Sequence, residues 1–222
     1  MLAAGEGTRL RPLTERWPKP ILPIDGRPVV STLLHELVGA GFEAITVVTG
    51  HLAEQVEELL SYLPYHVRFV RQPEPLGSAD AVRRAGPPRP PFFVTAADTV
   101  YSSGDARSFR EAFEESGGGG AISIRRQPGR PRYTRIAVED GRVVRVQDPN
   151  DDSGYTAAPL MALGSPVAER LAEDLPGPPY ELADAFQRAI DSGEEIVGIE
   201  IGRTRDLTDP LDLVEENFPY LG

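Results

Sequence analysis

The chain has 222 residues with 34 acidic and 23 basic side chains, giving a net charge of −11 and a pI near 4.8. A nucleic-acid-binding surface is normally basic, so this charge argues against a nucleic-acid partner. The sequence contains no cysteine, which excludes structural disulfides and thiolate metal ligands. Together with the lack of a recognisable signal peptide, this favours a reducing cytoplasm. No apolar run approaches the roughly 20 residues that span a bilayer, so we expect a soluble protein with no membrane partner.

The chain begins with a short apolar run that leads into a loop with glycines at positions 5 and 7. Glycine lets backbone N–H groups approach an anion without obstruction by a Cβ atom, and successive N–H groups in a tight turn form an anion-binding nest. The loop then presents Thr8, Arg9, Arg11 and Lys19. This combination predicts a phosphate site, although a Gly-x-Gly pattern alone is also typical of a plain turn between a strand and a helix.

Lys19 is the only lysine in the chain, and every other basic residue is an arginine. A sequence with so strong a bias toward arginine should have replaced a lysine that served only as a surface cation. We therefore expect Lys19 to supply a compact point charge, fitted to a phosphate oxygen, that a planar guanidinium cannot provide. The alternative is a lysine that survives by chance on a loop.

The residues after the loop alternate between helical and strand patterns. Apolar residues at helical spacing predict a helix over residues 29–40, and the apolar run at residues 44–49 predicts a strand. The alternation continues with a helix at 52–60, a strand at 67–70, a helix at 79–84, a strand at 92–98 and a helix at 106–115. This rhythm predicts a parallel sheet with helices on both faces.

Beyond residue 120 the pattern changes to strands. Strands are expected at 121–124, 135–138, 142–146 and 158–163, followed by a helix at 180–193 and a strand at 196–201. Asp140-Gly141 is a strong signal for a hairpin between the second and third of these strands.

The opening run, L-A-A-G-E-G-T-R-L-R-P-L-T followed by P-K-P-I-L-P-I, resembles the signature of the sugar-1-phosphate nucleotidyltransferases. The resemblance implies an α/β fold with a Rossmann-like mixed, mostly parallel sheet flanked by helices and a small β-hairpin subdomain on the acceptor side. It also implies an enzyme that joins a nucleoside triphosphate (NTP) to a phosphorylated acceptor and releases pyrophosphate. Members of this family usually carry several more apolar residues before L-A-A-G. The first strand is therefore expected either to be unusually short or to lack an N-terminal piece.

The resemblance assigns roles to individual residues of this chain. Arg9 would contact the transferring and leaving phosphates, and Lys19 the α-phosphate or the incoming phosphate. Asp98, at the end of a predicted strand, and Asp206 would hold Mg²⁺, because magnesium accepts few carboxylates and keeps phosphate oxygens and waters. The nucleotide-binding residues would be Leu2, Ala3, Ala4, Gly5, Glu6, Gly7, Thr8, Arg9, Gln72 and Gly77.

The resemblance implies that Gln72 would determine which nucleotide base is bound. It is expected just past the C-terminal end of a strand, where doubly wound sheets bind ligands. A carboxamide offers a donor and an acceptor together, as the imide edge of uracil or thymine requires, so UTP or dTTP is favoured. Gly77 would let the backbone approach the base. The alternative for Gln72 is a solvated glutamine in a turn.

The acceptor side departs from the family. Where relatives carry a lysine in V-x-E-K-P, this chain has Asp148, which would repel an acceptor phosphate. A cation from the arginine-rich segment 125–135 would have to compensate, and Arg132 or Arg135 is favoured because each flanks the matched hairpin position. Thr156 and Glu181 complete the predicted acceptor-binding set. All the arginines of this segment could instead be solvated surface charges.

We therefore expect one nucleotidyltransferase domain over residues 1–222. Residues 1–117 and 180–222 would form its nucleotide- and metal-binding part, and residues 118–179 its acceptor-side part. Three alternatives stay open: a guanylyl- or cytidylyltransferase acting on mannose 1-phosphate, transfer to a non-sugar acceptor such as a phosphorylated polyol or choline, and a non-catalytic nucleotide-binding regulatory protein. The sequence leaves the oligomeric state open.

Overall fold

The computed structural model describes residues 1–126, 134–150 and 154–218. Three parallel strands form one end of its sheet, in the order β1 (Leu2–Ala3), β4 (Ile45–Thr49) and β5 (Val67–Arg71). Helix α1 (Val29–Gly39) precedes β4, and helix α2 (Ala53–Ser61) connects β4 to β5. Parallel neighbours need such crossover helices, so this part is built as the helical and strand periodicities predict.

Six strands form the other end of the sheet. Strand β11 is antiparallel to both of its neighbours, β6 and β8, whereas β8 and β12 run parallel. The order is β6 (Phe92–Val94), β11 (Tyr155–Leu163), β8 (Gly120–Arg126), β12 (Ile196–Glu200), β10 (Arg142–Arg145) and β9 (Ala137–Glu139).

Backbone hydrogen bonds from Leu2 join the two ends into one sheet. The Leu2 N–H donates to the Thr95 carbonyl over 2.8 Å, and the Ala97 N–H donates to the Leu2 carbonyl over 2.9 Å. Across the joined sheet most strands point in one direction, with β11 and β10 running against it. The predicted α/β fold with a mixed, mostly parallel sheet is confirmed.

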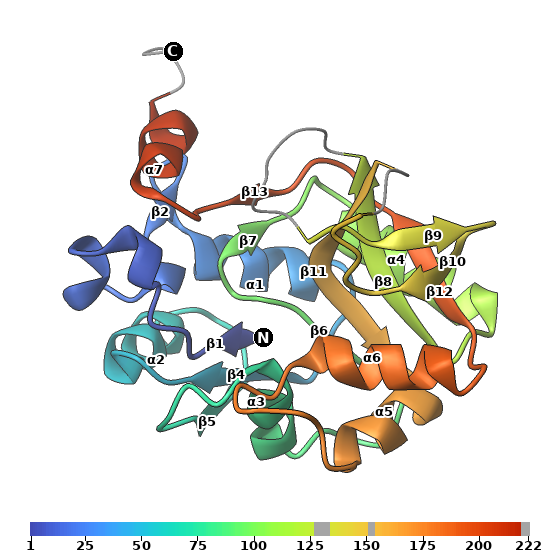
Figure 1. Ribbon diagram of the computed structural model, residues 1–222. Coiled ribbons are helices and arrows are strands. Elements are labelled where there is room, and N and C mark those ends of the chain that lie inside the picture. The colour runs from blue at the N-terminus through green and yellow to red at the C-terminus, as the bar shows by residue number, and fades with distance from the viewer. Residues whose placement is uncertain (127–133, 151–153, 219–222) are drawn as a thin grey trace.

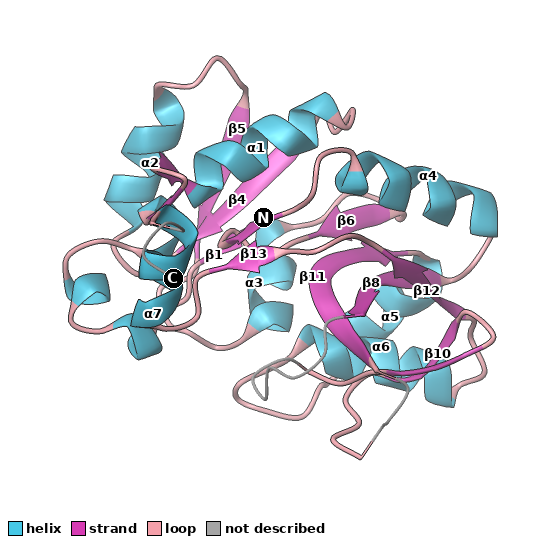
Figure 2. Ribbon diagram, turned by 90° about the horizontal axis from the view of Figure 1, so that it is seen from above, coloured by secondary structure: helices cyan, strands magenta, loops and turns pink. Residues whose placement is uncertain are grey.

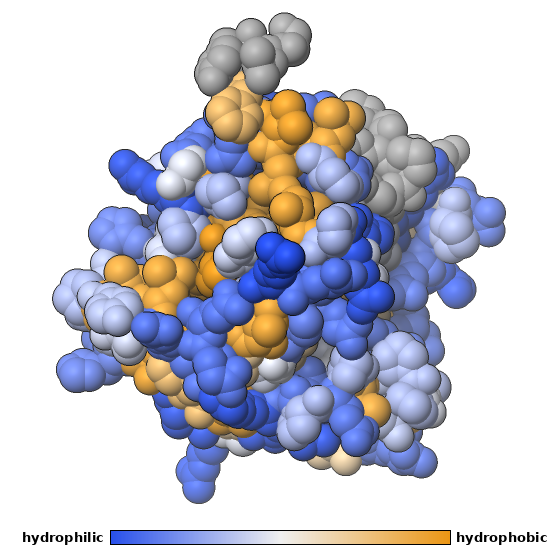
Figure 3. Space-filling model, turned by 90° about the vertical axis from the view of Figure 1, so that its left-hand side faces the viewer, coloured by the Kyte–Doolittle hydropathy of each residue, from blue (hydrophilic) through white to orange (hydrophobic). Residues whose placement is uncertain are grey.

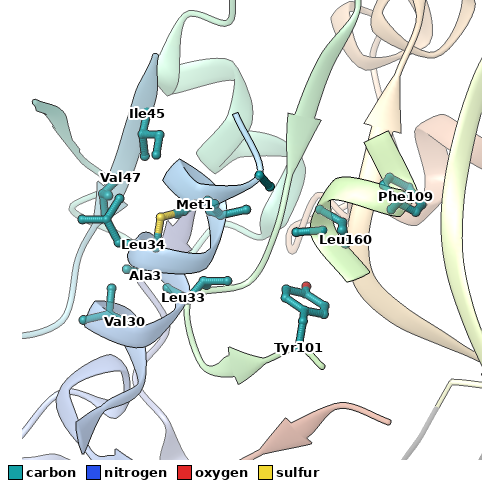
Figure 4. Close-up of a cluster of buried hydrophobic side chains, with 14 of the residues drawn as sticks. Met1, Ala3, Val30, Leu33, Leu34, Ile45, Val47, Tyr101, Phe109 and Leu160 are labelled. Atoms are coloured by element: carbon teal, nitrogen blue, oxygen red, sulfur yellow. The ribbon is translucent and has the colours of Figure 1, made fainter. Parts of the chain in front are cut away.

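Helices cover both faces of the sheet (Figures 1 and 2). Helices α1, α2 and α4 (Asp105–Ser116) lie on one face. Helices α3 (Ser78–Ala85), α5 (Ser165–Ala172) and α6 (Leu182–Asp191) lie on the other. Each face has its own apolar core, and the core beneath α1 includes Leu33, Leu34 and Val47, with the Met1 side chain beside them (Figure 4).

Two hairpins and one small pairing complete the architecture. Strands β9 and β10 meet at Asp140 and Gly141, whose φ values of 47° and 78° are those that a tight two-residue turn requires. The predicted hairpin is thus present, at the edge of the main sheet. Strand β2 (Pro23–Ile24) pairs with β3 (Arg27–Pro28), and β7 (Thr99–Val100) pairs with β13 (Arg205–Asp206).

The C-terminal helix α7 (Pro210–Asn217) packs on β2 and leaves apolar side chains in solvent. Leu211 and Val214 of this helix and Phe218 just after it are exposed. Figure 3 shows apolar surface at the top of the molecule, the end at which α7 lies in Figure 1. Among the described residues, no helix combines the length and apolar character that crossing a membrane requires.

Strand β1 spans only two residues, and the Met1 amine that precedes it is buried. The Met1 amine donates to the Thr46 carbonyl over 2.8 Å, and burial lowers the pKa of this amine to about 5. A pocket of about 550 Å³ continues from Met1 between β4 and β6, lined by Ile45, Phe93 and Val94 among others. The space beside Met1 is therefore bounded by two strands and lined largely by apolar side chains.

We expect three valines added before Met1 to raise the melting temperature and to reduce its pH dependence. In the 222-residue chain the unfolded state protonates this amine below its ordinary pKa of 8.0, whereas the folded state holds it neutral down to about pH 5. The unfolded state binds more protons in that window, so the free energy of unfolding falls as the pH drops from 8 to 5, by about 4 kcal/mol in the limit. Thermal unfolding at several pH values measures this.

An extension of three serines is the matched control, because it moves the amine away from Met1 without supplying apolar side chains for the pocket. The serine variant should lose the amine's pH dependence but gain less stability than the valine variant. Equal gains from valine and serine would contradict apolar filling of the pocket.

Candidate nucleotide-binding cleft

The loop after β1 folds into three short 3₁₀ turns, at Thr8–Leu10, Leu13–Glu15 and Lys19–Ile21. Gly7 has φ +63°, and a Cβ there would lie 2.9 Å from Thr14 Cγ2 and 3.3 Å from Lys19 Cβ. The Thr14 hydroxyl donates to the Gly7 carbonyl over 2.9 Å. Glycine is therefore required at this position for two reasons, its left-handed backbone and the close approach of the chain that carries Lys19.

A pocket of about 240 Å³ lies between this loop and the ends of β1 and β6. It brings together Arg9, Lys19 and Asp98 with nine other residues, five of which are also predicted to bind the nucleotide. The lining is Leu2, Ala3, Gly5, Gly7, Thr8, Arg9, Leu10, Lys19, Pro20, Ala96, Asp98 and Thr208.

Of the predicted nucleotide-binding residues in the loop, Ala4 and Glu6 do not line this pocket. Ala4 is buried, and Glu6 forms an ion pair with Arg11 at 3.0 Å. Arg9, in contrast, is exposed at the pocket and has no ion-pair partner among the described residues. Its guanidinium is thus available to an anionic ligand.

A second pocket, of about 280 Å³, continues the first. The two share Arg9, Lys19, Asp98 and Thr208, and the second adds Asp206. The four residues predicted to be catalytic or metal-binding therefore line one continuous cleft.

A third pocket, of about 240 Å³, extends the cleft toward α6. It shares Thr134, Ala157, Pro159 and Met161 with the second pocket and is also lined by Glu181, a predicted acceptor-binding residue.

The two predicted metal ligands reach the cleft from neighbouring strands. Asp98 immediately precedes β7, and the antiparallel register pairs Asp206 on β13 with Thr99 on β7. Asp98 forms an ion pair with Lys19, and the two side chains are 26% and 17% exposed. Partial burial lowers the effective dielectric constant, so this pair is stronger than a fully solvated one.

Asp98 and Asp206 fit a Mg²⁺ site only if a bound substrate supplies further oxygen ligands. Among the described residues, no group of three or more His, Cys, Asp or Glu side chains is placed to hold a metal ion. Magnesium is commonly bound by one or two carboxylates together with phosphate oxygens and waters. Asp98 and Asp206 on one pocket wall fit that pattern, with the remaining positions left to a phosphorylated ligand.

The phenol of Tyr101 is buried near charged residues of the cleft. Burial raises the pKa of Tyr101, whose hydroxyl is hydrogen bonded to the Thr95 hydroxyl at 2.7 Å. Smaller electrostatic effects act on the pKa of the same phenol: Asp98 raises it and Arg125 lowers it. The phenol is therefore neutral at physiological pH, and it lies within electrostatic range of both charged groups.

Gln72 and Gly77 lie together, but neither lines the three pockets of the cleft. The Gln72 side chain is buried and donates to the Gly77 carbonyl over 3.0 Å and to Asp80 Oδ2 over 2.8 Å. Because both partners are acceptors, the orientation of the carboxamide is fixed, and its oxygen is the atom left to meet a ligand. The fold requires glycine at position 77, since a Cβ there would lie 2.3 Å from the Tyr180 carbonyl oxygen.

The four predicted acceptor-binding residues do not come together in one place. Arg132 lies outside the described residues. Arg135 is exposed and lines none of the three pockets, although its backbone bridges to Thr156. Thr156 is buried, whereas Glu181 lines the third pocket and accepts a hydrogen bond from the Ser78 hydroxyl over 2.6 Å.

Sequence reasoning missed two features of the cleft. Thr208 lines both the first and second pockets, although the sequence analysis assigned it no role. Arg125, one of several arginines in its segment, is buried with Nη2 4.0 Å from Asp206 Oδ2. The predicted strand ended at residue 124, one residue before Arg125, and the strand pairing that buries Arg125 is with Thr156, 31 positions away.

Known proteins resemble this chain in sequence and in fold. The family model described as Nucleotidyl transferase matches residues 1–217. The bifunctional protein GlmU of Acidovorax ebreus is 31% identical over 228 residues, which cover 91% of this chain and 46% of that protein. A 2-aminoethylphosphonate cytidylyltransferase from Lancefieldella rimae is 49% identical over 55 residues, which cover 25% of this chain and 22% of that protein. The chain thus spans about half the length of the GlmU relatives that it matches.

A solved structure shows the same fold. The putative glucose-1-phosphate thymidylyltransferase from Bacillus anthracis, in complex with a sucrose, superposes with a TM-score of 0.84. The match covers 97% of this chain and 92% of that one at 20% sequence identity. At this identity the likeness concerns the fold alone.

We expect Gly77→Ala to destabilise the protein by roughly 2 kcal/mol more than Gly104→Ala, because only the first Cβ meets backbone. Both glycines have positive φ, +100° and +88°, but nothing lies within 4 Å of a Cβ at Gly104. Urea unfolding of the two variants measures the difference. Equal losses would show that backbone strain alone, and not the approach of Tyr180, requires glycine at position 77.

Proposed function

We propose, because the chain belongs to the nucleotidyl transferase family, that it transfers a nucleotidyl group from an NTP to a sugar 1-phosphate. An oxygen of the acceptor phosphate attacks the α-phosphorus, a new phosphoanhydride bond forms, and the bond from the α-phosphorus to the bridging oxygen of the β-phosphate breaks. The products are a nucleoside diphosphate sugar and pyrophosphate. One observation carries this proposal: Arg9, Lys19, Asp98 and Asp206, from separate parts of the chain, line one cleft.

Each of these residues has a role suited to its position. The exposed Arg9 binds the phosphates that become pyrophosphate, and Lys19 binds the α-phosphate or the incoming phosphate. Asp98 and Asp206 hold Mg²⁺, which would neutralise charge on the phosphates. Such preorganised charges lower the barrier because charge shifts onto the leaving pyrophosphate in the transition state. Lys19 must leave its pair with Asp98, or share it, when the nucleotide enters.

We propose UTP or dTTP as the nucleotide. The oxygen of the Gln72 carboxamide accepts from an N–H group, and uracil and thymine present one at N3. Cytosine also presents an N–H, at its exocyclic amine. The 49% identity with a cytidylyltransferase over 55 residues therefore makes a cytidylyltransferase, with a phosphonate or another non-sugar acceptor, the second candidate.

Incubation with each NTP, Mg²⁺ and a panel of phosphorylated acceptors, followed by assay of released pyrophosphate, tests the proposal. We expect acceptor-dependent release with UTP or dTTP and none when EDTA is added. Release with CTP alone would favour the second candidate. Nucleotide binding without release for any pair would support a non-catalytic regulatory protein.

We expect Lys19→Arg to lower turnover on the order of 10²-fold even though the charge is retained, because the broad guanidinium cannot occupy the position of the ammonium beside Asp98. Steady-state kinetics with the best nucleotide and acceptor measures this. Arg16→Lys is the matched control, since Arg16 is exposed outside the cleft linings, and it should leave the rate unchanged. A Lys19→Arg enzyme of near-normal rate would refute a phosphate-positioning role for this lysine.

A further inference from the structure

Two side chains from the connection between β4 and α2, and from α2 itself, hold the loop that lines the cleft. His51 Nε2 lies 2.5 Å from the carbonyl oxygen of Thr14, and Gln55 Nε2 donates to the carbonyl of Arg16 over 2.9 Å. A carbonyl oxygen can only accept, so the Nε2 atom of His51 carries a proton and donates to Thr14. Both hydrogen bonds therefore hold the second of the loop's 3₁₀ turns, Leu13–Glu15, or the residue that follows it.

The backbone beside His51 is packed against the start of the same loop. The His51 N–H donates to the Ala4 carbonyl over 3.3 Å, and a Cβ at Gly50 would lie 2.7 Å from the Ala4 carbonyl oxygen. The loop itself is built from 3₁₀ turns of 3 residues each, which are too short to be stable by themselves. Residues 50–55 therefore supply support that the loop's own turns do not.

Contacts lead from His51 to the lysine of the cleft. Thr14 is buried, with 1% of its surface exposed, and its hydroxyl donates to the Gly7 carbonyl over 2.9 Å. The Gly7 backbone in turn lies so close to Thr14 and Lys19 that it leaves no room for a Cβ. Of these four residues only Gly7 and Lys19 line the first pocket, so His51 acts on the cleft through the loop and not by direct contact.

We propose that His51 is a positioning residue for the nucleotide phosphates: its hydrogen bond to Thr14 fixes the turn at Gly7 and, through it, the position of Lys19. This inference rests on the proposed function, in which the loop and Lys19 bind those phosphates. A loop that is already held in its bound shape loses less conformational entropy when a ligand binds, so it binds the ligand more tightly. The hydrogen bond of His51 thus raises the affinity of a pocket that the imidazole does not line.

A second histidine provides a matched control. His35 Nδ1 lies 2.5 Å from the Tyr65 hydroxyl, and His35 lines neither the first nor the second pocket. Replacing either histidine by leucine removes one hydrogen bond of an imidazole, so the two variants should lose comparable stability. Only the change at position 51 releases the loop. A residue that served the fold alone would give both variants the same loop protection and the same ligand affinity.

The test compares His51→Leu, His51→Gln and His35→Leu in the full chain. Hydrogen exchange without ligand, followed by mass spectrometry, measures the protection of residues 5–16, and calorimetry measures the binding of inorganic pyrophosphate with Mg²⁺. We expect His51→Leu to exchange these amides about tenfold faster than the parent and to bind pyrophosphate about fivefold more weakly. Glutamine keeps an amide donor in place of Nε2, so His51→Gln should stay within about twofold of the parent in both measurements, as should His35→Leu.

Loop exchange that is the same in His51→Leu as in His35→Leu would overturn the inference. Faster loop exchange with unchanged pyrophosphate affinity would also overturn it, and would leave the proposed function standing. If His51→Leu does not fold, His51→Asn takes its place, because the shorter amide does not reach the Thr14 carbonyl, and full loop protection in that variant would again overturn the inference. A parent protein that binds no pyrophosphate would contradict the proposed function itself, so the parent tests the function and the variants test His51.

Discussion

The cleft depends on the two backbone hydrogen bonds that join Leu2 to Thr95 and Ala97. They attach the short β1 strand to the end of β6, so the loop predicted to bind phosphate begins directly beside the segment that leads to Asp98. Without this junction the three-stranded and six-stranded parts would be separate sheets, and Lys19 would not meet Asp98. The position of the charges in the site is therefore a consequence of sheet pairing, which long-range contacts stabilise.

The balance of charge in the cleft is the second constraint. Each of the two carboxylates faces a cation of this chain, with Lys19 beside Asp98 and Arg125 near Asp206. A partly buried carboxylate without a compensating charge is costly, so these cations stabilise the ligand-free cleft. The same cations would favour phosphates, which links the stability of the empty site to the anionic substrate that we propose. Arg9 stands apart as the exposed cation at the mouth of the cleft.

The features that sequence predicted well are those with local causes. Glycines at positions 5 and 7 mark the loop after β1, and the alternation of helical and strand periodicity marks the order of elements up to α4. Helix α5 was missed because it is only eight residues long, although the proline in its first turn is typical of a helix start. Asp206 was found through family resemblance, since nothing local marks β13 as a strand.

The features that sequence could not supply have non-local causes. Pairing of β8 with β11 decides that Arg125 is buried, and no periodicity reports that pairing. The hydrogen bonds of the Gln72 amide to Gly77 and Asp80 likewise appear only when the chain folds back on itself, and they reduce its base-pairing capacity to a single acceptor. The roles of the site residues stay predictions, as does the division of the domain into nucleotide and acceptor parts.

The central claim is that one cleft holds the nucleotide phosphates and the acceptor phosphate around a single metal position. Phosphorus-31 relaxation of a complex with Mn²⁺, an α,β-methylene analogue of UTP and glucose 1-phosphate tests it most directly, because the analogue cannot react. The account predicts rapid relaxation of both the analogue and the acceptor phosphorus, and loss of this enhancement in Asp98→Asn. An acceptor phosphorus that relaxes as it does without protein, while the analogue remains bound, would contradict it.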